Sequence, residues 1–468
     1  MRRGFKHIRI SLLSLALLAL SAQTVMAQDM RSVVEPVIPK SCTILSAELT
    51  AANNRLPDSA ESRLDTARVQ SALDHCTPGE AVELKSDGAS NAFLSGPLNL
   101  RSGVTLLVDR GVTLYASRNP RLYDKTPGSC GTMSAQGHGC LPLISVTDAK
   151  NAAVMGDGTV DGQGDATVIG HSFTWWQLAM AAHHAHLLQS CPRLIIADHA
   201  DGFTLYKITL HNSGNFHVVV QNTDGFTAWG IHIQSPTTRG LLALNTDGID
   251  PGNSTNLTVA HSWIDSGDDN IAIKTNVTHM SVLDNHFYEG HGMSIGSETY
   301  SGDSYLLVDG LTEDGTTNGI RVKSNDSKGG LVHDLTYRNI CMRNVYMPIA
   351  LSPFYNNTPF ESFTDPNIPG DRIPDFKSIR IENVMDLTPG NVLIAGKDAN
   401  HVTEVLLNGV TIRGIKPSQV HAQFARVEIG PKGANFTPKG NEVTVVHVKA
   451  GTPASAWSSC NGKFLPMQ

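Results

Sequence analysis

The sequence predicts an all-β protein: a single-stranded, right-handed parallel β-helix of about ten coils, closed by an N-terminal capping helix. The main observation is a repeat of strand-like segments. Segments 203–210 and 226–233 begin 23 residues apart, as do segments 257–264 and 280–287. No helical pattern separates them, which argues against a fold built from βαβ units. The right hand follows from the general rule for parallel strand connections. Weaker copies of the repeat occur near Leu306, Leu335, Ile379, Val405 and Val443.

Composition supports the same fold class. Only 17% of the residues are charged, 42 are Gly, and Val, Ile, Thr and Asn are frequent through the middle of the chain. This mixture suits many short strands joined by tight turns. Because each coil of a solenoid stacks on the preceding one, a chain of 468 residues can form one continuous core and does not need several separate ones.

A signal peptide is predicted at 1–27, which leaves 28–468 as one β-helix domain. Four basic residues precede an apolar run at 10–22 that is too short to span a bilayer, and Val25-Met26-Ala27 offers a cleavage site. The alternative is a retained anchor. Cleavage removes four positive charges, so the formal charge becomes −7 − 4 = −11. We therefore expect a secreted, extracellular protein without membrane contact, and its acidity argues against nucleic acid as a partner.

The N-terminal part is expected to begin with a helix that covers the open end of the coils. Asp65 is its predicted N-cap, and the helix should run to about Cys76, because apolar residues recur there at i, i+3, i+4 and i+7. Strands are expected at 81–84, 104–108 and 112–115.

A second helix or a long loop is predicted at 173–188. Trp175-Trp176 in this insertion would either stack on a sugar ring or pack on the β-wall. Three histidines have a spacing that does not suit one metal ion, so a solvated loop is the preferred interpretation for His183, His184 and His186.

Seven cysteines in an exported chain predict disulfides. Cys130 and Cys140 flank a Gly-rich loop and are one predicted pair, and Cys42 and Cys76 are the second. One of the remaining three must stay unpaired: Cys191, Cys341 or Cys460. Cys341 lies in an apolar, strand-like run and is predicted to be a buried free thiol.

Carboxylates recur at nearly the coil spacing in the stretch from Asn245 to Lys323. Asp268 follows Asp247 after about one repeat, and His291 follows Asp269 in the same way. If each step is one coil, the three Asp side chains stack roughly 4.8 Å apart, and one of them keeps a proton. Such a group could protonate a glycosidic oxygen while another carboxylate activates water. The alternative is that these Asp only fill turns.

Two further features favour catalysis on an acidic polysaccharide. Arg321 and Lys323 occupy alternate positions of one strand, so they share one face and can bind a sugar carboxylate. Alternatively, they are ion-pair partners of the Asp cluster. His291 stands between two glycines, where the bent backbone allows the imidazole to reach the site. Asp268 and Asp269 are neighbours, so both can face the site only if Gly267 breaks the strand.

These motifs resemble those of glycoside hydrolase family 28, the polygalacturonases. They occur in the family's order: Asn245-Thr-Asp247, Gly267-Asp-Asp269, Gly290-His-Gly292, Arg321-Val-Lys323, with Gly158–Gly164 and Asn212–His217 as further elements. The resemblance covers roughly 80 to 400, and the departure at Val322, where isoleucine is common, faces away from the site.

The resemblance implies inverting hydrolysis of α-1,4-linked galacturonan without cofactor or metal. Asp268 would be the general acid, Asp247 and Asp269 would activate water, and His291 would support them. Substrate would be bound by Arg321, Lys323, Tyr355 and Asn245. We expect an endo-acting monomer. The alternatives are an exo-polygalacturonase, a rhamnogalacturonan or xylogalacturonan hydrolase, a calcium-dependent pectate lyase, and a non-catalytic glycan-binding β-helix adhesin.

Overall fold

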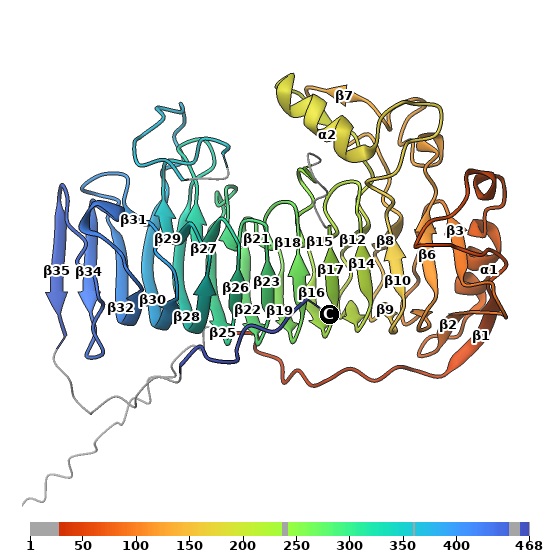
Figure 1. The fold of residues 1–468 in the computed structure, drawn as a ribbon, viewed down its shortest axis with the longest axis horizontal. Helices are drawn as coiled ribbons and strands as arrows, with labels where there is room; N and C mark the ends of the chain where they lie inside the picture. The colour runs from red at the N-terminus through yellow and green to blue at the C-terminus, as the bar shows by residue number, and fades with distance from the viewer. Residues whose placement is uncertain (1–27, 236–241, 359–360, 449–458, 468) are drawn as a thin grey trace, which may run out of the picture.

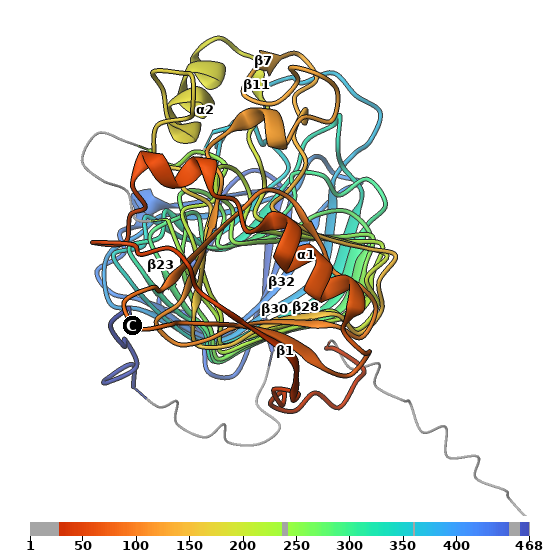
Figure 2. The same ribbon diagram turned by 90° about the vertical axis from the view of Figure 1, so that its right-hand side faces the viewer.

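The chain winds into a right-handed parallel β-helix (Figure 1). The structure is a computed structural model that describes residues 28–235, 242–358, 361–448 and 459–467. The signal peptide predicted at 1–27 lies outside the described residues. Viewed along the long axis, the coils superimpose around one interior (Figure 2). The predicted fold class is confirmed.

One wall of the β-helix, which we call the site wall, is an 11-stranded parallel sheet, in agreement with the predicted number of coils. Its strands are β4 (Leu98–Asn99), β8 (Ile144–Thr147), β12 (Ile195–Asp198), β15 (Val218–Gln221), β18 (Ile249–Gly252), β21 (Ile271–Ile273), β24 (Met293–Ile295), β27 (Asn318–Lys323), β29 (Met347–Ser352), β31 (Val392–Ala395) and β33 (Val420–Gln423).

The other walls form a 22-stranded sheet, which contains the three strands expected near the N-terminus. Its strands are β1 (Ser41–Ser46), β2 (Ala81–Lys85), β3 (Ala92–Ser95), β5 (Thr105–Val108), β6 (Thr113–Ala116), β9 (Ala153–Met155), β10 (Thr159–Asp161), β13 (Thr204–Tyr206), β14 (Thr209–His211), β16 (Asp224–Trp229), β17 (His232–Gln234), β19 (Thr255–Ala260), β20 (Trp263–Asp265), β22 (Val277–Leu283), β23 (His286–Tyr288), β25 (Asp303–Asp309), β26 (Thr312–Asp314), β28 (Leu331–Arg343), β30 (Asp375–Asp386), β32 (Thr403–Ile412), β34 (Ala425–Ile429) and β35 (Val443–His447).

The remaining elements lie outside these walls. They are the antiparallel pair β7 (Met133–Ser134) and β11 (Leu188–Gln189), the helices α1 (Thr66–His75) and α2 (Trp175–His184), and the 3-10 turns η1 (Asp58–Ser62), η2 (Pro120–Leu122) and η3 (Pro417–Gln419).

Register aligns aliphatic side chains along the interior of the site wall. Ile249 pairs with Ile271, Ile271 with Met293, and Met293 with Ile320. All four are buried in one continuous core. Each partner lies about one sequence repeat after the previous one, so each sequence repeat corresponds to one coil, as predicted. Each residue next to a core position must then point away from the interior.

The repeated eight-residue segments each supply two strands rather than one. Segment 203–210, for example, contains β13 and β14. The chain turns between the two strands at a residue with positive φ, which is Lys207 in this coil and Gly230, His261 and Asp284 in the next three. A single left-handed residue bends the strand at the corner between two walls.

Helix α1 covers the N-terminal end of the coils, as predicted (Figure 2). Val69 and Leu73 of α1 are buried in the main core. Asp65 precedes the helix but its side chain does not cap it, which corrects the expectation. Its carboxylate instead accepts hydrogen bonds from the Leu94 N–H at 2.8 Å and from Arg68 Nε at 2.7 Å. The carboxylate therefore fastens the helix to β3.

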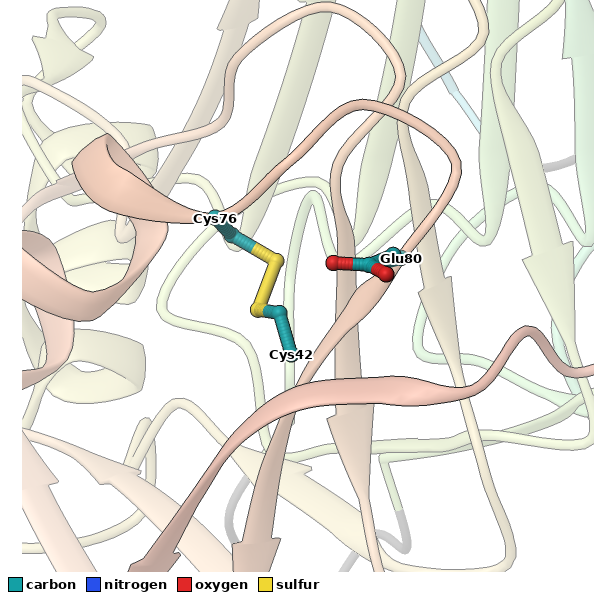
Figure 3. Close-up of side chains that lie close together, drawn as sticks. All are labelled: Cys42, Cys76 and Glu80. Atoms are coloured by element: carbon teal, nitrogen blue, oxygen red, sulfur yellow. A yellow bond between two sulfur atoms is a disulfide. The ribbon is translucent and has the colours of Figure 1, made fainter.

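Three disulfides are formed among the seven cysteines. Cys42–Cys76 and Cys130–Cys140 are confirmed, and the third is Cys341–Cys460. The prediction that Cys341 is a free thiol is wrong, because the chain near residue 460 returns to β28; the free, buried cysteine is Cys191. Figure 3 shows Glu80 beside the first disulfide. The two sulfur atoms of this disulfide are bonded to each other, so they are not free to hold a metal ion beside Glu80.

The insertion at 173–188 contains α2, which begins with a capping box formed by Thr174 and Gln177. Trp175 and Trp176 are buried, and Trp176 Nε1 donates to Ser213 O at 2.8 Å. The packing interpretation of this pair is therefore correct. The three histidines of this segment are exposed, as predicted, but His183 and His184 form the end of α2 and do not lie in a loop. No helix in the described part of the chain is long and apolar enough to cross a membrane.

A buried acid in the core predicts how stability depends on pH. Glu313 in β26 is 0% exposed and is in register with core residues Phe287 and Met342. Burial raises its pKa well above the ordinary value, against a smaller lowering effect of the Met293 N–H. The stabilising contribution of this proton is present below the pKa of the unfolded chain and is lost as pH rises through the folded pKa.

Glu313→Gln is therefore expected to reduce the loss of stability with rising pH. The measurement is the free energy of unfolding in urea at several pH values from about 4 to 8, the range above the ordinary Glu pKa. Glu442→Gln, at an exposed position, is the control and should follow the parent. Equal pH slopes for parent and Glu313→Gln would contradict the prediction.

Candidate active site

The predicted site residues come from four successive strands of the site wall. Asp247 precedes β18, Asp268 and Asp269 precede β21, and His291 precedes β24. Arg321 and Lys323 lie within β27. The registers of these strands are continuous, so the side chains meet on one outer face.

The three predicted carboxyl groups lie together. Asp247, Asp268 and Asp269 each offer an oxygen atom within 4.8 Å of the others. The side chain of Asp268 is 21% exposed and that of Asp269 is 2% exposed, while Asp247 is buried as well. Asp268 is therefore the member of the cluster that a ligand can reach first.

Gly267 explains how two neighbouring Asp side chains can share one site. The chain leaves β20 of the 22-stranded sheet, turns through Gly267 and enters β21 of the site wall. A Cβ atom at Gly267 would lie only 2.1 Å from Ala243 O, so no larger residue fits this turn. Within the turn, the Asp269 N–H donates to Asp268 Oδ1 at 2.9 Å. The predicted break in the strand is present.

The pKa values of the two buried carboxyl groups move in opposite directions. Burial raises the pKa of Asp247 well above its ordinary value, and the carboxyl groups of Asp250 and Asp268 raise it further. Burial also acts to raise the pKa of Asp269, but Lys323 and Arg321 outweigh it and hold that pKa below its ordinary value. The cluster therefore combines a carboxyl group that favours a proton with one that stays ionised.

Both predicted cations contact Asp269. Lys323 Nζ lies 2.8 Å from Oδ2, and Arg321 Nη1 lies 3.0 Å from Oδ1. Ser294 Oγ donates to Oδ1 at 2.7 Å. This is the ion-pair arrangement that the sequence allowed as the alternative to a sugar-binding clamp. The Arg321 side chain is 1% exposed and that of Lys323 is 5% exposed.

Arg321 has a second carboxylate partner that sequence analysis missed. Its Nε and Nη2 atoms lie 2.8 and 2.7 Å from Oε1 of Glu361. Nη2 also donates to Thr358 O at 3.3 Å. Glu361 follows β29 in an irregular segment without any repeat, so the sequence offered no signal for it.

His291 faces the acid cluster. Gly290 has a φ of 67°, and a Cβ there would lie 2.6 Å from Asp268 O, so the turn needs glycine. His291 Nδ1 is 2.8 Å from Thr317 Oγ1, and Nε2 is 3.9 Å from Asp268 Oδ1. The threonine hydroxyl fixes the ring so that the second nitrogen faces Asp268.

Asn245 connects the cluster to the inserted segment. Its Nδ2 lies 3.4 Å from Asp268 Oδ2, and its Oδ1 accepts a hydrogen bond of 2.9 Å from Gln189 Nε2 in β11. Gln189 was not predicted, because nothing in the sequence shows where an insertion folds back. The ring centre of Tyr355 lies 5.0 Å from Lys323 Nζ, so this residue also borders the site.

Two projections stand along the site wall on either side of these strands: α2 with β7, and the loop that follows β29 (Figure 1). A hollow of about 860 Å³ lies elsewhere, on the outer faces of β25, β28, β30, β32 and β34. None of the predicted site residues lines it.

Comparisons with known proteins match most of the chain. The model of Glycosyl hydrolases family 28 matches residues 84–429. The chain is 42% identical over 409 residues to an endo-polygalacturonase of Pectobacterium carotovorum subsp. carotovorum, covering 86% of this chain and 94% of that protein. It is 36% identical to a polygalacturonase of Ralstonia solanacearum, with 98% of both chains covered. The solved polygalacturonase from Erwinia carotovora ssp. carotovora superimposes with a TM-score of 0.74 at 38% identity, covering 89% of this chain and 100% of that chain.

Proposed function

Since the chain belongs to glycosyl hydrolase family 28 and is a glycoside hydrolase, we propose that it is an endo-polygalacturonase acting on polygalacturonate. The observation that carries the proposal is the group of three carboxyl groups within 4.8 Å of one another, beside two buried cations. Protonated and ionised carboxyl groups side by side are what glycosidic hydrolysis requires. The similarity to the endo-polygalacturonase of Pectobacterium supports cleavage within the chain.

Asp268 is assigned as the general acid because it is the most exposed of the three. Its proton passes to the leaving glycosidic oxygen as the bond from the anomeric carbon breaks. Asp247 and Asp269 hold the attacking water, whose oxygen bonds to the anomeric carbon while its proton passes to Asp247. Asp247 suits this step because its raised pKa makes it the stronger base of the two. His291 supports Asp268.

In the free protein, burial favours the protonated form of Asp247, because it raises the pKa of that group. Hydrolysis requires the proton on Asp268 instead, with Asp247 ionised. Since these carboxyl oxygens lie within 4.8 Å, one proton can serve both groups.

Inversion is proposed from the family resemblance. Carboxyl oxygens within 4.8 Å of one another lie closer than the roughly 6.5–9.5 Å that usually separates the two carboxyl groups of inverting enzymes. Inversion is compatible with it if the water lies beside the acid pair rather than between two opposed groups. Proton NMR of the first product decides this: inversion of an α-linkage gives the β-anomer, whereas the α-anomer would establish retention.

Substrate binding is assigned to Arg321, Lys323, Tyr355 and Asn245. Arg321 and Lys323 are paired with Asp269, and Arg321 also with Glu361, so these carboxylates hold both cations in place at the site, where they would attract a uronate carboxylate. The chain needs no metal for this chemistry: a divalent ion would compete with cations that already neutralise Asp269. Activity should therefore survive chelator, unlike that of a calcium-dependent lyase.

Product sizing after brief digestion of polygalacturonate tests the proposal. A ladder of oligomers is expected, and monomer or dimer alone would indicate exo action. Greater release of reducing ends from rhamnogalacturonan or xylogalacturonan would assign the alternative substrates. Products that absorb in the ultraviolet would indicate a lyase, and binding without release would indicate an adhesin.

We also propose that the protein is exported as residues 28–468 and acts as an extracellular monomer. Three disulfides support an oxidising compartment. N-terminal sequencing of the exported protein should begin at Gln28, and light scattering should give the mass of one chain. A membrane-associated product that still begins at Met1 would contradict this.

A further inference from the structure

A second charged group lies on the outer face of the site wall, beside the carboxylate cluster. Lys274 follows β21, directly after Ile273, which is in register with Ile295 and, through it, with Val322. Lys274 therefore lies in the same column as Lys323, two coils nearer the N-terminal end. The intervening position is Gly296, which has no side chain to separate the two lysines. Two coils correspond to roughly 9.6 Å.

The ammonium group of Lys274 has two carboxylates nearby but makes few hydrogen bonds. In the part of the chain that the structure describes, Nζ donates one hydrogen bond, to Gly296 O at 3.4 Å. The carboxylates of Asp250 and Glu298 lie at 3.7 and 4.0 Å, beyond hydrogen-bonding distance. An ammonium has three donors, and the side chain is only 22% exposed. Two donors therefore remain for a ligand in a partly desolvated setting.

Asp250 gives a second, independent indication of a ligand site near Lys274. It points to the outer face because it follows the core residue Ile249 in β18. It is 2% exposed, and neither of its carboxyl oxygens has a hydrogen-bond partner among the described residues. A buried polar group without a partner is costly unless a ligand or water completes it.

We propose that Lys274, Asp250 and Glu298 form a further uronate-binding subsite on the site wall, in which Lys274 takes the sugar carboxylate and Asp250 a sugar hydroxyl. The subsite deepens the proposed function and rests on it. A polyuronide repeats its carboxylate with every sugar, so it can contact Lys274 and Lys323 together along one column.

Lys274→Met tests the subsite, with Lys377→Met as a matched control. Lys377 also lies near two carboxylates, and its side chain is 24% exposed, but it belongs to another wall. Kinetics on polygalacturonate should show KM raised about tenfold in Lys274→Met, the loss of one charge-assisted contact, with kcat within about twofold. End-labelled galacturonate oligomers should be cut at a different bond, while Lys377→Met matches the parent.

Charge recognition gives a second readout. The parent should prefer unesterified over methyl-esterified substrate, Lys274→Met should lose most of this preference, and Lys274→Arg should keep it. Unchanged KM and cleavage positions in Lys274→Met would overturn the subsite. A fall in kcat alone would also overturn it, assigning Lys274 to the electrostatics of the Asp cluster. A parent that does not cut polygalacturonate would instead overturn the proposed function.

Discussion

Asp268→Asn is expected to lower kcat on polygalacturonate by about 10³- to 10⁴-fold, the upper part of the range that general acid catalysis contributes. The amide has the size of the carboxyl group but gives no proton to a leaving oxygen. Its oxygen can still accept the Asp269 N–H that Asp268 accepts at 2.9 Å. The fold should therefore survive, with a melting temperature within about 1 °C of the parent, a change of less than about 1 kcal/mol.

Two comparisons make this result specific. Asp87→Asn, in an exposed turn, should retain full activity. A galacturonide with an aryl leaving group that needs no proton should be cut by Asp268→Asn nearly as well as by the parent. If Asp268→Asn keeps more than a tenth of the parent kcat on polygalacturonate, Asp268 is not the general acid.

Coil spacing was sufficient to predict which polar residues meet, since stacking converts sequence distance into spatial order. Asp247, Asp269 and His291 each lie two positions before a core residue of the next strand: Ile249, Ile271 and Met293. Their alignment therefore follows from the period of the aliphatic residues. Along a strand, each neighbour of a core residue points outward, and this alternation placed Arg321 outside the core. The same alternation could also have identified Asp250, which follows the core residue Ile249.

Contacts made by segments outside the period could not be predicted. Gln189 and Glu361 reach the site from an insertion and a loop whose paths no repeat determines. The pairing of Cys341 with Cys460 spans 119 residues and depends on where the C-terminal segment returns. Asp65 failed as a cap for a related reason: one of its donors, the Leu94 N–H, comes from elsewhere in the fold.

The same geometry explains why the two cations were ambiguous in sequence. An Arg and a Lys at alternate positions of a strand share a face, but that face holds both the Asp cluster and the proposed substrate. The structure shows that pairing with Asp269 is already made. Stability and substrate binding therefore depend on the same side chains, and a substitution there should affect both.

Arg321→Met is expected to be the most destabilising change at the site. Arg321 is the buried cation between Asp269 and Glu361, with contacts of 3.0 and 2.7 Å. Removing one member of a buried ion-pair network leaves carboxylates uncompensated, which costs roughly 3–5 kcal/mol. Urea unfolding near pH 7 should show this loss, and activity should fall because Asp269 loses one of the cations that keep it ionised.

The pH dependence of this loss identifies its cause. The lowered pKa of Asp269 stabilises the parent above the ordinary Asp pKa of about 4, and that contribution is lost as pH falls through the folded value. The difference between parent and Arg321→Met should therefore shrink below about pH 4. Arg338→Met removes a pair with Asp309 whose arginine is 45% exposed, and should cost only about 0–1 kcal/mol. An equally small cost for Arg321→Met would mean that the buried carboxylates are neutral in the folded protein, and the ionised state assigned to Asp269 would be wrong.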